Sequence, residues 1–385
     1  MNIFVVSEAF ERPIPTGGAL ESLGSLSAKA CGACHQSIYD EWSTTIHSQA
    51  WTDPYFQVDW IFDGRQQVCK NCHIPLDRQQ EQRVLGFEDR EKWRPILEKN
   101  PDFDPGLQHE GVTCAACHLR DGAILGVYGG DGAPHPVRKI ADSNEICLRC
   151  HVVGGNRWDT FYRVPPCGTV AEIQSARRTS GEASGAGLGC VQCHMPLTER
   201  PLVPGKAARA VRSHLWRGGH DPDTVKKALS VTFEEIPRLP RDARSFALTI
   251  TNIGAAHYVP TGTPDRHLTV SIRLLDRNGA VLRAKEFVLS RTIMWRPFIV
   301  DLWDDRLPRG EPRVYRFEYA DGDNLGVVAI EASVRYHLLA EVRRQRIEYE
   351  NVDPIAYDVY RSRIALKRGA FASPTALRAG ADSHR

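Results

Sequence analysis

Ten of the eleven cysteines lie in five copies of one pattern, Cys-x-x-Cys-His. Two thiols one helical turn apart can form thioethers with the two vinyl groups of a porphyrin, and the adjacent histidine then binds the iron as proximal ligand. The spacing is therefore typical of covalent haem c attachment, and five copies predict five haems. The copies are Cys31, Cys34 and His35; Cys69, Cys72 and His73; Cys114, Cys117 and His118; Cys147, Cys150 and His151; and Cys190, Cys193 and His194.

Other uses of paired cysteines explain the pattern less well. A disulfide framework, a structural zinc site or a thioredoxin-like redox pair does not require a histidine directly after the second cysteine. The eleventh cysteine, Cys167 in Val-Pro-Pro-Cys-Gly, has no partner in the pattern. A buried thiol, a thiolate ligand of a haem and an intermolecular disulfide are all open for it.

The second axial ligand of each iron decides between an electron carrier and a site open to substrate. Methionine cannot supply five such ligands, because the chain has only three methionines, of which one is terminal and Met195 adjoins the proximal His194. Histidine is the alternative, and nine histidines lie outside the motifs. Six are candidate distal ligands: His47, His109, His135, His214, His220 and His257. We expect structural or exposed roles for His267, His337 and His384.

Distance along a helix shows which haem two of these candidates cannot serve. His47 stands 12 residues after His35 on a continuous helical pattern, so the rings are about 18 Å apart at 1.5 Å per residue. Since each ligand lies about 2 Å from the metal, His47 must serve a neighbouring haem. By the same argument, His109 cannot ligate the iron bound by His118 and must serve another haem.

The other candidates are placed by their surroundings. His214 and His220 flank Gly218 and Gly219 just after the fifth motif, on different faces of a helix, so they would serve different haems. His135 is held in a loop between two prolines, and His257 lies in a loop between two strands from which it could reach across a domain interface. There are six candidate distal histidines for five irons, so full bis-histidine ligation and one or more open haems are both compatible with the sequence.

Composition and hydrophobic pattern divide the chain into four parts. We expect an extended arm over residues 1–27, a pentahaem cytochrome c domain over 28–227, a β-sandwich domain over 228–352 and a basic C-terminal tail over 353–385. The haem domain is expected to be mainly helical or irregular, with a solvated helix pair between Asp77 and Glu98. The sandwich is expected to be all β and immunoglobulin-like, with alternating strands near 246–251, 268–274, 314–319 and 327–336.

Composition limits the classes of function. There are 49 basic and 47 acidic residues, giving a formal net charge of +2, which does not favour a nucleic-acid binder. No stretch approaches the roughly 18 apolar residues of a membrane span.

Haem c is attached outside the cytoplasm, so we expect an exported protein of the periplasm or cell surface. Met1 to Glu11 shows neither the basic nor the long apolar region of a signal peptide, so a mature or truncated form is expected.

Three segments resemble the multihaem cytochrome c superfamily, which includes the tetrahaem cytochromes of nitrification, hydroxylamine oxidoreductase and pentahaem nitrite reductase. They are Cys31 to His47, His109 to His118 and Cys190 to Pro196, and the likeness covers about residues 28–225. It implies distal-ligand positions for His47 and His109. The loop 252–262 resembles one in multihaem cytochromes with a C-terminal immunoglobulin-like domain. The chain lacks the Cys-x-x-Cys-Lys site of the nitrite reductases and a tyrosine motif for a crosslinked haem, so the resemblance favours an electron-transfer member.

These observations lead to one main hypothesis and two alternatives. The main one is an electron carrier in which closely packed, mostly bis-histidine haems pass electrons between redox partner proteins, such as other cytochromes or a quinol-linked donor. The first alternative is an oxidoreductase with one open haem that acts on a small nitrogen, sulfur or peroxide substrate. The second is a homo-oligomer or filament that conducts along its haems.

Overall fold

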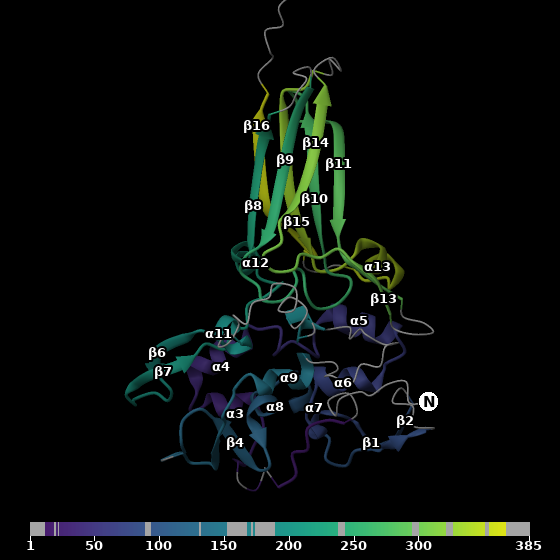
Figure 1. Ribbon diagram of the computed structural model, residues 1–385. Coiled ribbons are helices and arrows are strands. Elements are labelled where there is room, and N and C mark those ends of the chain that lie inside the picture. The colour runs from purple at the N-terminus through teal and green to yellow at the C-terminus, as the bar shows by residue number, and fades with distance from the viewer. Residues whose placement is uncertain are drawn as a thin grey trace, which may run out of the picture.

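The computed structural model describes residues 12–18, 21, 23–88, 94–130, 132–151, 168–170, 172–173, 189–237, 243–294, 300–320, 326–350 and 354–366. Short helices and two- or three-stranded sheets alternate up to residue 212, below an upright pair of larger sheets (Figure 1). The helices here are α3 (Ala28–Gly32), α4 (Gln36–Ser43), α5 (Pro54–Phe62), α6 (Gln67–His73), the 3₁₀ turn η1 (Asp77–Gln79), α7 (Pro105–Gln108), α8 (Cys114–His118), α9 (Glu145–His151) and α11 (Cys190–His194). The strands are β1 (Gln82–Phe87), β2 (Pro95–Lys99), β3 (Leu119–Arg120), β4 (Ala123–Gly126), β5 (Val137–Lys139), β6 (Leu197–Pro201) and β7 (Ala208–Arg212).

Three helices begin with the same dipeptide, Asp-Pro. Asp53, Asp104 and Asp221 are the N-caps of α5, α7 and α12 (Pro222–Ala228), and each aspartate accepts a hydrogen bond from a backbone amide of the first turn. The following proline has no amide proton to satisfy and is already in a helical φ. The local sequence therefore defines where these helices start.

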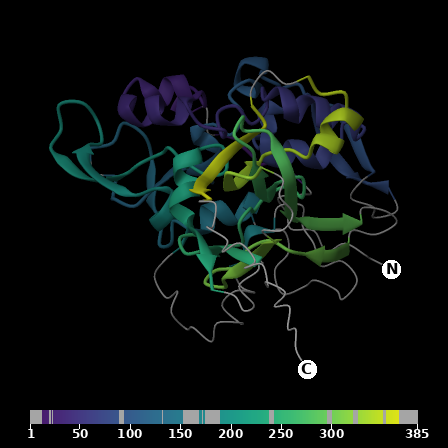
Figure 2. The ribbon, with the colours of Figure 1, turned by 90° about the horizontal axis from the view of Figure 1, so that it is seen from above.

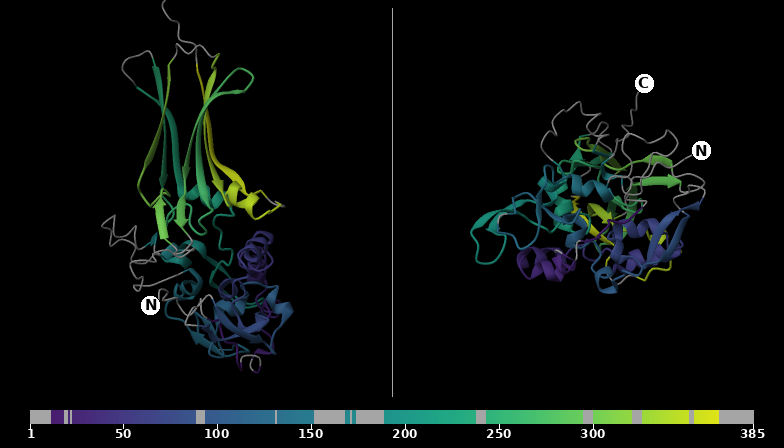
Figure 3. Two further views of the ribbon diagram at one scale, coloured as in Figure 1. Left: turned by 90° about the vertical axis from the view of Figure 1, so that its right-hand side faces the viewer. Right: turned by 90° about the horizontal axis from the view of Figure 1, so that it is seen from below.

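The second half of the described chain is built from two antiparallel sheets that face each other (Figure 3, left). One has the order β11-β10-β15-β16 and the other β14-β9-β8, and a β12-β13 hairpin lies beside them. The strands are β8 (Leu229–Ile236), β9 (Ala243–Asn252), β10 (His267–Leu275), β11 (Val281–Leu289), β12 (Arg291–Met294), β13 (Val300–Asp304), β14 (Arg313–Ala320), β15 (Ala329–His337) and β16 (Ala356–Ala365), with the helix α13 (Glu341–Arg346) between the last two.

The core between these sheets follows from the alternation along the strands. Along β10 every second residue from Leu268 to Leu274 is fully buried, and Phe246, Leu248 and Ile250 of β9 are buried in the same cluster. Successive side chains of a strand point to opposite faces, so one face of each sheet supplies this core. The strand β16 lies in the range predicted as a tail and pairs with β15 along its length.

The predicted fold class is wrong. A mainly helical or irregular haem region followed by an all-β region does not describe the chain, which is mixed, with small sheets among the helices of its first half. The helix pair expected between Asp77 and Glu98 is instead η1 followed by the antiparallel pair β1-β2. The charged residues there suggested solvated helices, but Arg83 pairs with Glu98 across the two strands at 2.8 Å, which is a cross-strand contact.

The two halves meet at the lower end of the larger sheets. Arg343 of α13 donates from Nε to Asp59 Oδ1 of α5 at 3.1 Å, and the rings of Tyr55 and Tyr349 lie 5.7 Å apart. In the view from above, the yellow-green α13 segment lies beside the blue-violet helices near residue 60 (Figure 2). The segment around α13 is thereby held against α5, the helix that precedes the motif-bearing α6.

Candidate functional site

Each Cys-x-x-Cys-His motif lies on or at the end of a short helix. Because residues three apart on a helix lie on one face, both thiols of a motif face the same side and the histidine continues from that edge. No disulfide links the ten described cysteines. The helices are α3, α6, α8, α9 and α11.

Thiols of different motifs lie in contact, which gives the spatial order of the five sites. Hydrogen bonds join a thiol of the first motif to one of the third, the second to the fourth, and the fourth to the fifth. The third and fourth motifs also lie close enough for Cys117 and Cys150 to interact electrostatically. The order in space is thus first, third, fourth and fifth, with the second beside the fourth. The bonded pairs are Cys31 with Cys114, Cys72 with Cys150 and Cys147 with Cys190.

The proximal imidazoles are oriented by the backbone. In four of the five motifs Nδ1 lies within hydrogen-bonding distance of a backbone carbonyl, to which it can donate, and this leaves the Nε2 lone pair for a metal. Carbonyls of residues outside the motif helices supply these contacts. The pairs are His35 with Leu202 (3.1 Å), His73 with Ala50 (2.6 Å), His118 with Leu125 (2.8 Å) and His194 with Arg217 (3.0 Å).

Three proximal histidines each face a histidine from outside the motifs. Two imidazoles that bind one iron from opposite sides have ring centroids about 6 Å apart, since each centroid lies about 3 Å from the metal. The observed separations fit this value. They are 6.2 Å for His118 and His214, 6.3 Å for His151 and His47, and 6.3 Å for His194 and His257.

Burial keeps these imidazoles neutral, as ligation requires. Desolvation lowers the pKa of His47 to about 4, and the nearby His151 lowers it further. Burial is also the main cause of the lowered pKa of His214, about 4, and of the lowered pKa of His257. A neutral imidazole with its Nδ1 turned to a carbonyl offers its Nε2 lone pair. His214 and His257 have such a contact, with the carbonyls of Arg212 and Tyr258 at 2.9 and 2.8 Å.

The remaining two proximal histidines have different neighbours among the described residues. The ring of His73 is stacked on Phe56, with centroids 3.6 Å apart, and burial lowers its pKa to about 4. His35 lies near His118, whose pKa it helps to lower. No facing histidine ring is observed for either in the described ranges.

The other three candidates are not brought opposite a proximal histidine by the described structure. His109 is exposed, with Nδ1 2.8 Å from the carbonyl of Pro105. His135 is half-buried beside Pro136, and His220 Nε2 lies 3.1 Å from the guanidinium of Arg266. Of the histidines expected to be structural, His267 and His337 stack on each other at 4.2 Å. Cys167 and His384 lie outside the described residues.

Glu41 was not identified from the sequence, yet it holds the segment that carries His214. Its carboxylate accepts hydrogen bonds from both terminal nitrogens of Arg200 at 2.8 Å. It also accepts one from the backbone amide of His214 at 2.7 Å. Burial alone would raise the pKa of Glu41, but the hydrogen bonds from Arg200 and His214 lower it overall. Nothing in the position of Glu41, six residues after the first motif, signals this contact.

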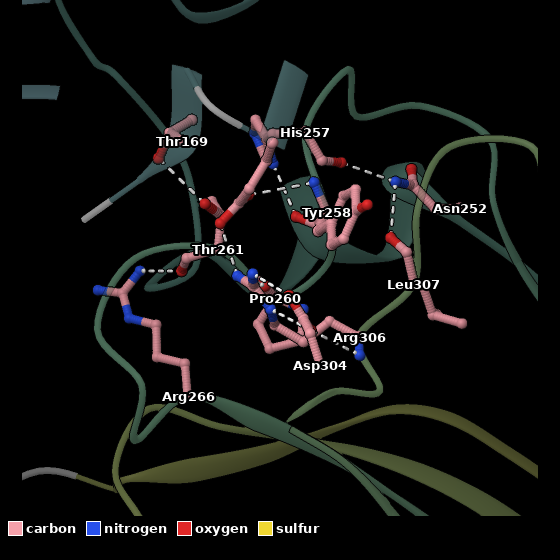
Figure 4. Close-up of polar contacts among 11 residues, drawn as sticks. Thr169, Asn252, His257, Tyr258, Pro260, Thr261, Arg266, Asp304, Arg306 and Leu307 are labelled. Carbon is pink, nitrogen blue, oxygen red and sulfur yellow. Dashed lines mark hydrogen bonds and ion pairs between the residues drawn. The ribbon is translucent and has the colours of Figure 1, made fainter. Parts of the chain in front are cut away.

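Contacts of Asn252 and Arg306 hold the loop of His257 (Figure 4), together with a buried ion pair. The side chains of Arg306 and Glu172 are 4% and 6% exposed and form an ion pair at 2.6 Å. The second carboxylate oxygen of Glu172 accepts a hydrogen bond from the amide of Tyr258 at 3.2 Å. Arg306 also donates to the carbonyl of Pro260. Asn252, fully buried, donates to the carbonyl of His257 at 2.9 Å. The loop is thus hydrogen-bonded on both sides of its histidine.

Gly111 lies against the backbone of His47. Its φ is +58°, and a Cβ placed there would come within 2.8 Å of the carbonyl oxygen of His47 and 3.0 Å of the amide nitrogen of Ala50. The next residue, Val112, donates its amide to the same His47 carbonyl at 2.9 Å. This close approach requires glycine.

Comparison with solved structures supports the fold of the chain. No protein-family model and no curated protein matches the chain. The crystal structure of a penta-haem cytochrome c552 from Thermochromatium tepidum aligns with 90% of this chain and 100% of that chain, with a TM-score of 0.65 and 17% sequence identity. The chain has a multihaem cytochrome fold. A structural genomics target named SoR45 aligns with a TM-score of 0.16, too low to support an argument.

Two further findings concern only the described residues. No group of three or more His, Cys, Asp or Glu side chains is arranged there to hold a metal ion by itself. None of the described helices is both long enough and apolar enough to cross a membrane.

Proposed function

We propose that the chain is a pentahaem c-type cytochrome that carries electrons between redox partner proteins. Haem c is bound through the five pairs of cysteines and the five proximal histidines, and the third, fourth and fifth irons are bis-histidine ligated by His214, His47 and His257. One observation carries this proposal: three facing imidazole pairs have the centroid separation of 6.2 to 6.3 Å that a shared iron requires.

Bis-histidine ligation suits a carrier better than a catalyst. A haem held by two imidazoles exchanges one electron and has no coordination position for substrate. The protein contributes by holding both rings still. Backbone carbonyls orient the proximal imidazoles, and the Glu41 and Glu172 contacts hold the distal ones, so the ligands need not reorganise when the charge of the iron changes.

The contacts between thiols support a route for electrons that differs from the order of the motifs. Attachment sites run from the first to the third, fourth and fifth motif, and the second branches from the fourth. The fourth site, with Cys147 and Cys150, contacts three others. We expect electrons that enter at the first or second site to pass through the fourth.

Localisation and partners follow from the same chemistry. Because haem c is attached outside the cytoplasm, the protein acts in the periplasm or at the cell surface. Its partners are redox proteins that present a donor or acceptor near one of the terminal sites. The arginines, which outnumber the lysines in the chain, suit the propionates of five haems, since guanidinium pairs bidentately with carboxylates.

Haem stoichiometry is the first test. Intact-mass measurement of the protein purified from a host with a cytochrome c maturation system should give the chain plus five haems. Replacing both cysteines of one motif by alanine, as in Cys190→Ala with Cys193→Ala, should remove one haem. An unchanged mass in that double variant would contradict attachment at this motif.

Ligation is tested by electron paramagnetic resonance of the ferric protein. His214→Ala and His257→Ala should each convert one low-spin iron to high spin, whereas the control His267→Ala should convert none. A stoichiometric high-spin signal in the unmodified protein that shifts with cyanide or nitrite would instead indicate an open site and contradict a pure carrier. High-spin content that stays the same in both variants would exclude the assigned distal ligands.

A further inference from the structure

The indole of Trp216 lies between two of the facing imidazole pairs. Its ring centroid is 5.0 Å from that of His47, with the planes at 83°, and 5.0 Å from that of His214, with the planes at 84°. His47 faces His151 and His214 faces His118, so one side chain makes an edge-on contact with the distal candidate of both the fourth and the third site. Edge-to-face contact is a favoured arrangement of aromatic rings.

The backbone of Trp216 has a left-handed conformation. Its φ is +41°, a region that bulky residues rarely adopt and that persists only where the surrounding structure imposes it. Hydrogen bonds on both sides supply that constraint. Two residues earlier, the amide of His214 is bound by Glu41, and one residue later the carbonyl of Arg217 lies 3.0 Å from His194 Nδ1.

The three facing pairs differ in the angle between their ring planes. The angle is 11° for His194 and His257 at the fifth site, and 27° for His118 and His214 at the third. At the fourth site the planes of His47 and His151 are crossed at 72°. Because the indole stands nearly perpendicular to the ring of His47, turning this ring toward the plane of His151 would give up the edge-to-face contact with Trp216.

We propose that Trp216 is a positioning residue that holds the imidazole of His47 crosswise to that of His151. The proposal rests on the bis-histidine ligation proposed above and deepens it. The angle between two axial imidazoles sets the splitting of the iron d orbitals that overlap with their π systems. Crossed planes make two of these orbitals nearly equal in energy, and parallel planes separate them. Trp216 thereby gives the fourth iron, which stands at the branch of the electron route, an electronic structure unlike that of the third and fifth.

Electron paramagnetic resonance reads this angle directly. A ferric iron with crossed imidazoles gives a highly anisotropic low-spin signal with one very large g value, whereas parallel imidazoles give a rhombic low-spin signal. We expect the unmodified protein to show the highly anisotropic signal and His47→Ala to remove it. In Trp216→Ala the signal should be lost and replaced by an equal amount of rhombic low-spin signal, because the His47 ring is free to turn.

Two further variants separate this role from a structural one. Trp216→Phe retains an aromatic ring at the same place and should keep most of the anisotropic signal, which also protects the test if the alanine variant folds poorly. Trp303→Ala removes an indole that is 58% exposed on β13 and should leave the spectrum unchanged.

The outcomes distinguish this inference from the proposed function. If all irons stay low-spin and the anisotropic signal persists in Trp216→Ala, Trp216 does not set the angle, although bis-histidine ligation stands. The absence of an anisotropic signal from the unmodified protein, with every iron low-spin, also overturns the inference alone. If the fourth iron is already high-spin in the unmodified protein, so that His47→Ala removes no low-spin signal, both proposals fail.

Discussion

The backbone amide of His214 donates a hydrogen bond to Glu41 Oε2 at 2.7 Å, although 173 residues separate the two along the chain. Glu41 belongs to α4, directly after the first motif, and His214 faces the proximal histidine of the third. A carboxylate beside one attachment site therefore holds the candidate ligand of another. The first and third sites are linked by this contact as well as by the thiols of Cys31 and Cys114.

Removing this carboxylate should loosen the third site. Glu41→Ala leaves Arg200 and the His214 amide without their acceptor, and we expect a loss of about 2 to 3 kcal/mol in the free energy of unfolding, since hydrogen bonds to charged groups contribute about that much. Urea titration measures the loss, and a rise in high-spin ferric signal would report detachment of His214. The control Glu199→Ala changes an exposed carboxylate on β6 and should cost less than about 0.5 kcal/mol. Equal stability of the two variants would contradict the role of Glu41.

A methyl group at Gly111 should disturb the fourth site. In Gly111→Ala the new Cβ would approach the His47 carbonyl oxygen at 2.8 Å and the residue would also be strained at positive φ, so we expect destabilisation by at least about 1 kcal/mol and a changed spectrum at the iron bound by His47. The control is Gly279→Ala, which has φ +81° and nothing within 4 Å of its Cβ. That variant carries the backbone strain alone. An unchanged spectrum in Gly111→Ala would show that the contact does not position His47.

Breaking the buried ion pair should release the loop of His257. Arg306→Met leaves the carboxylate of Glu172 buried without a cation, with an expected cost of about 3 to 5 kcal/mol. Glu172→Gln should cost less, because Arg306 keeps its ion pair with Asp304 at 2.6 Å. The double variant should cost less than the sum of the two single variants. Thermal or urea unfolding gives these energies, and the low-spin signal of the fifth site should weaken in both single variants. The exposed Arg309→Met serves as the control, and a loss as large there would refute a specific role for the pair.

The stability contributed by Glu81 should depend on pH in the acid range. Burial alone would raise the pKa of Glu81, but hydrogen bonds from Lys70 and Gln108 lower it overall. A carboxylate whose folded pKa is below its unfolded value of about 4.3 contributes stability that is fully present above that value and is lost as the pH falls through the lowered pKa. The difference in unfolding free energy between the unmodified protein and Glu81→Gln should be constant from pH 7 to about 5 and shrink below about 4. The control Glu311→Gln removes an exposed carboxylate and should cost less than about 0.5 kcal/mol.

Local features of the site were accessible from the sequence. The pair of thiols and the histidine of each motif depend on a single helical turn, so their spacing predicts five attachment sites. Alternation predicts four of the nine described strands of the second half, β9, β10, β14 and β15. The segment between Asp77 and Glu98 shows the limit of such reasoning. Its charges fit a solvated helix as well as a strand pair, and the pairing of Arg83 with Glu98 depends on which segments meet.

The sequence by itself predicts the proximal side of each proposed haem site, because spacing within five residues is enough for that. Only the tertiary structure decided which distant histidine faces which motif: His47 precedes its partner, whereas His214 and His257 follow theirs, and the three come from different segments. The same holds for Glu41, Glu172 and Trp216. Their contacts join segments that no periodicity connects, and packing of the whole chain is what brings them within bonding distance.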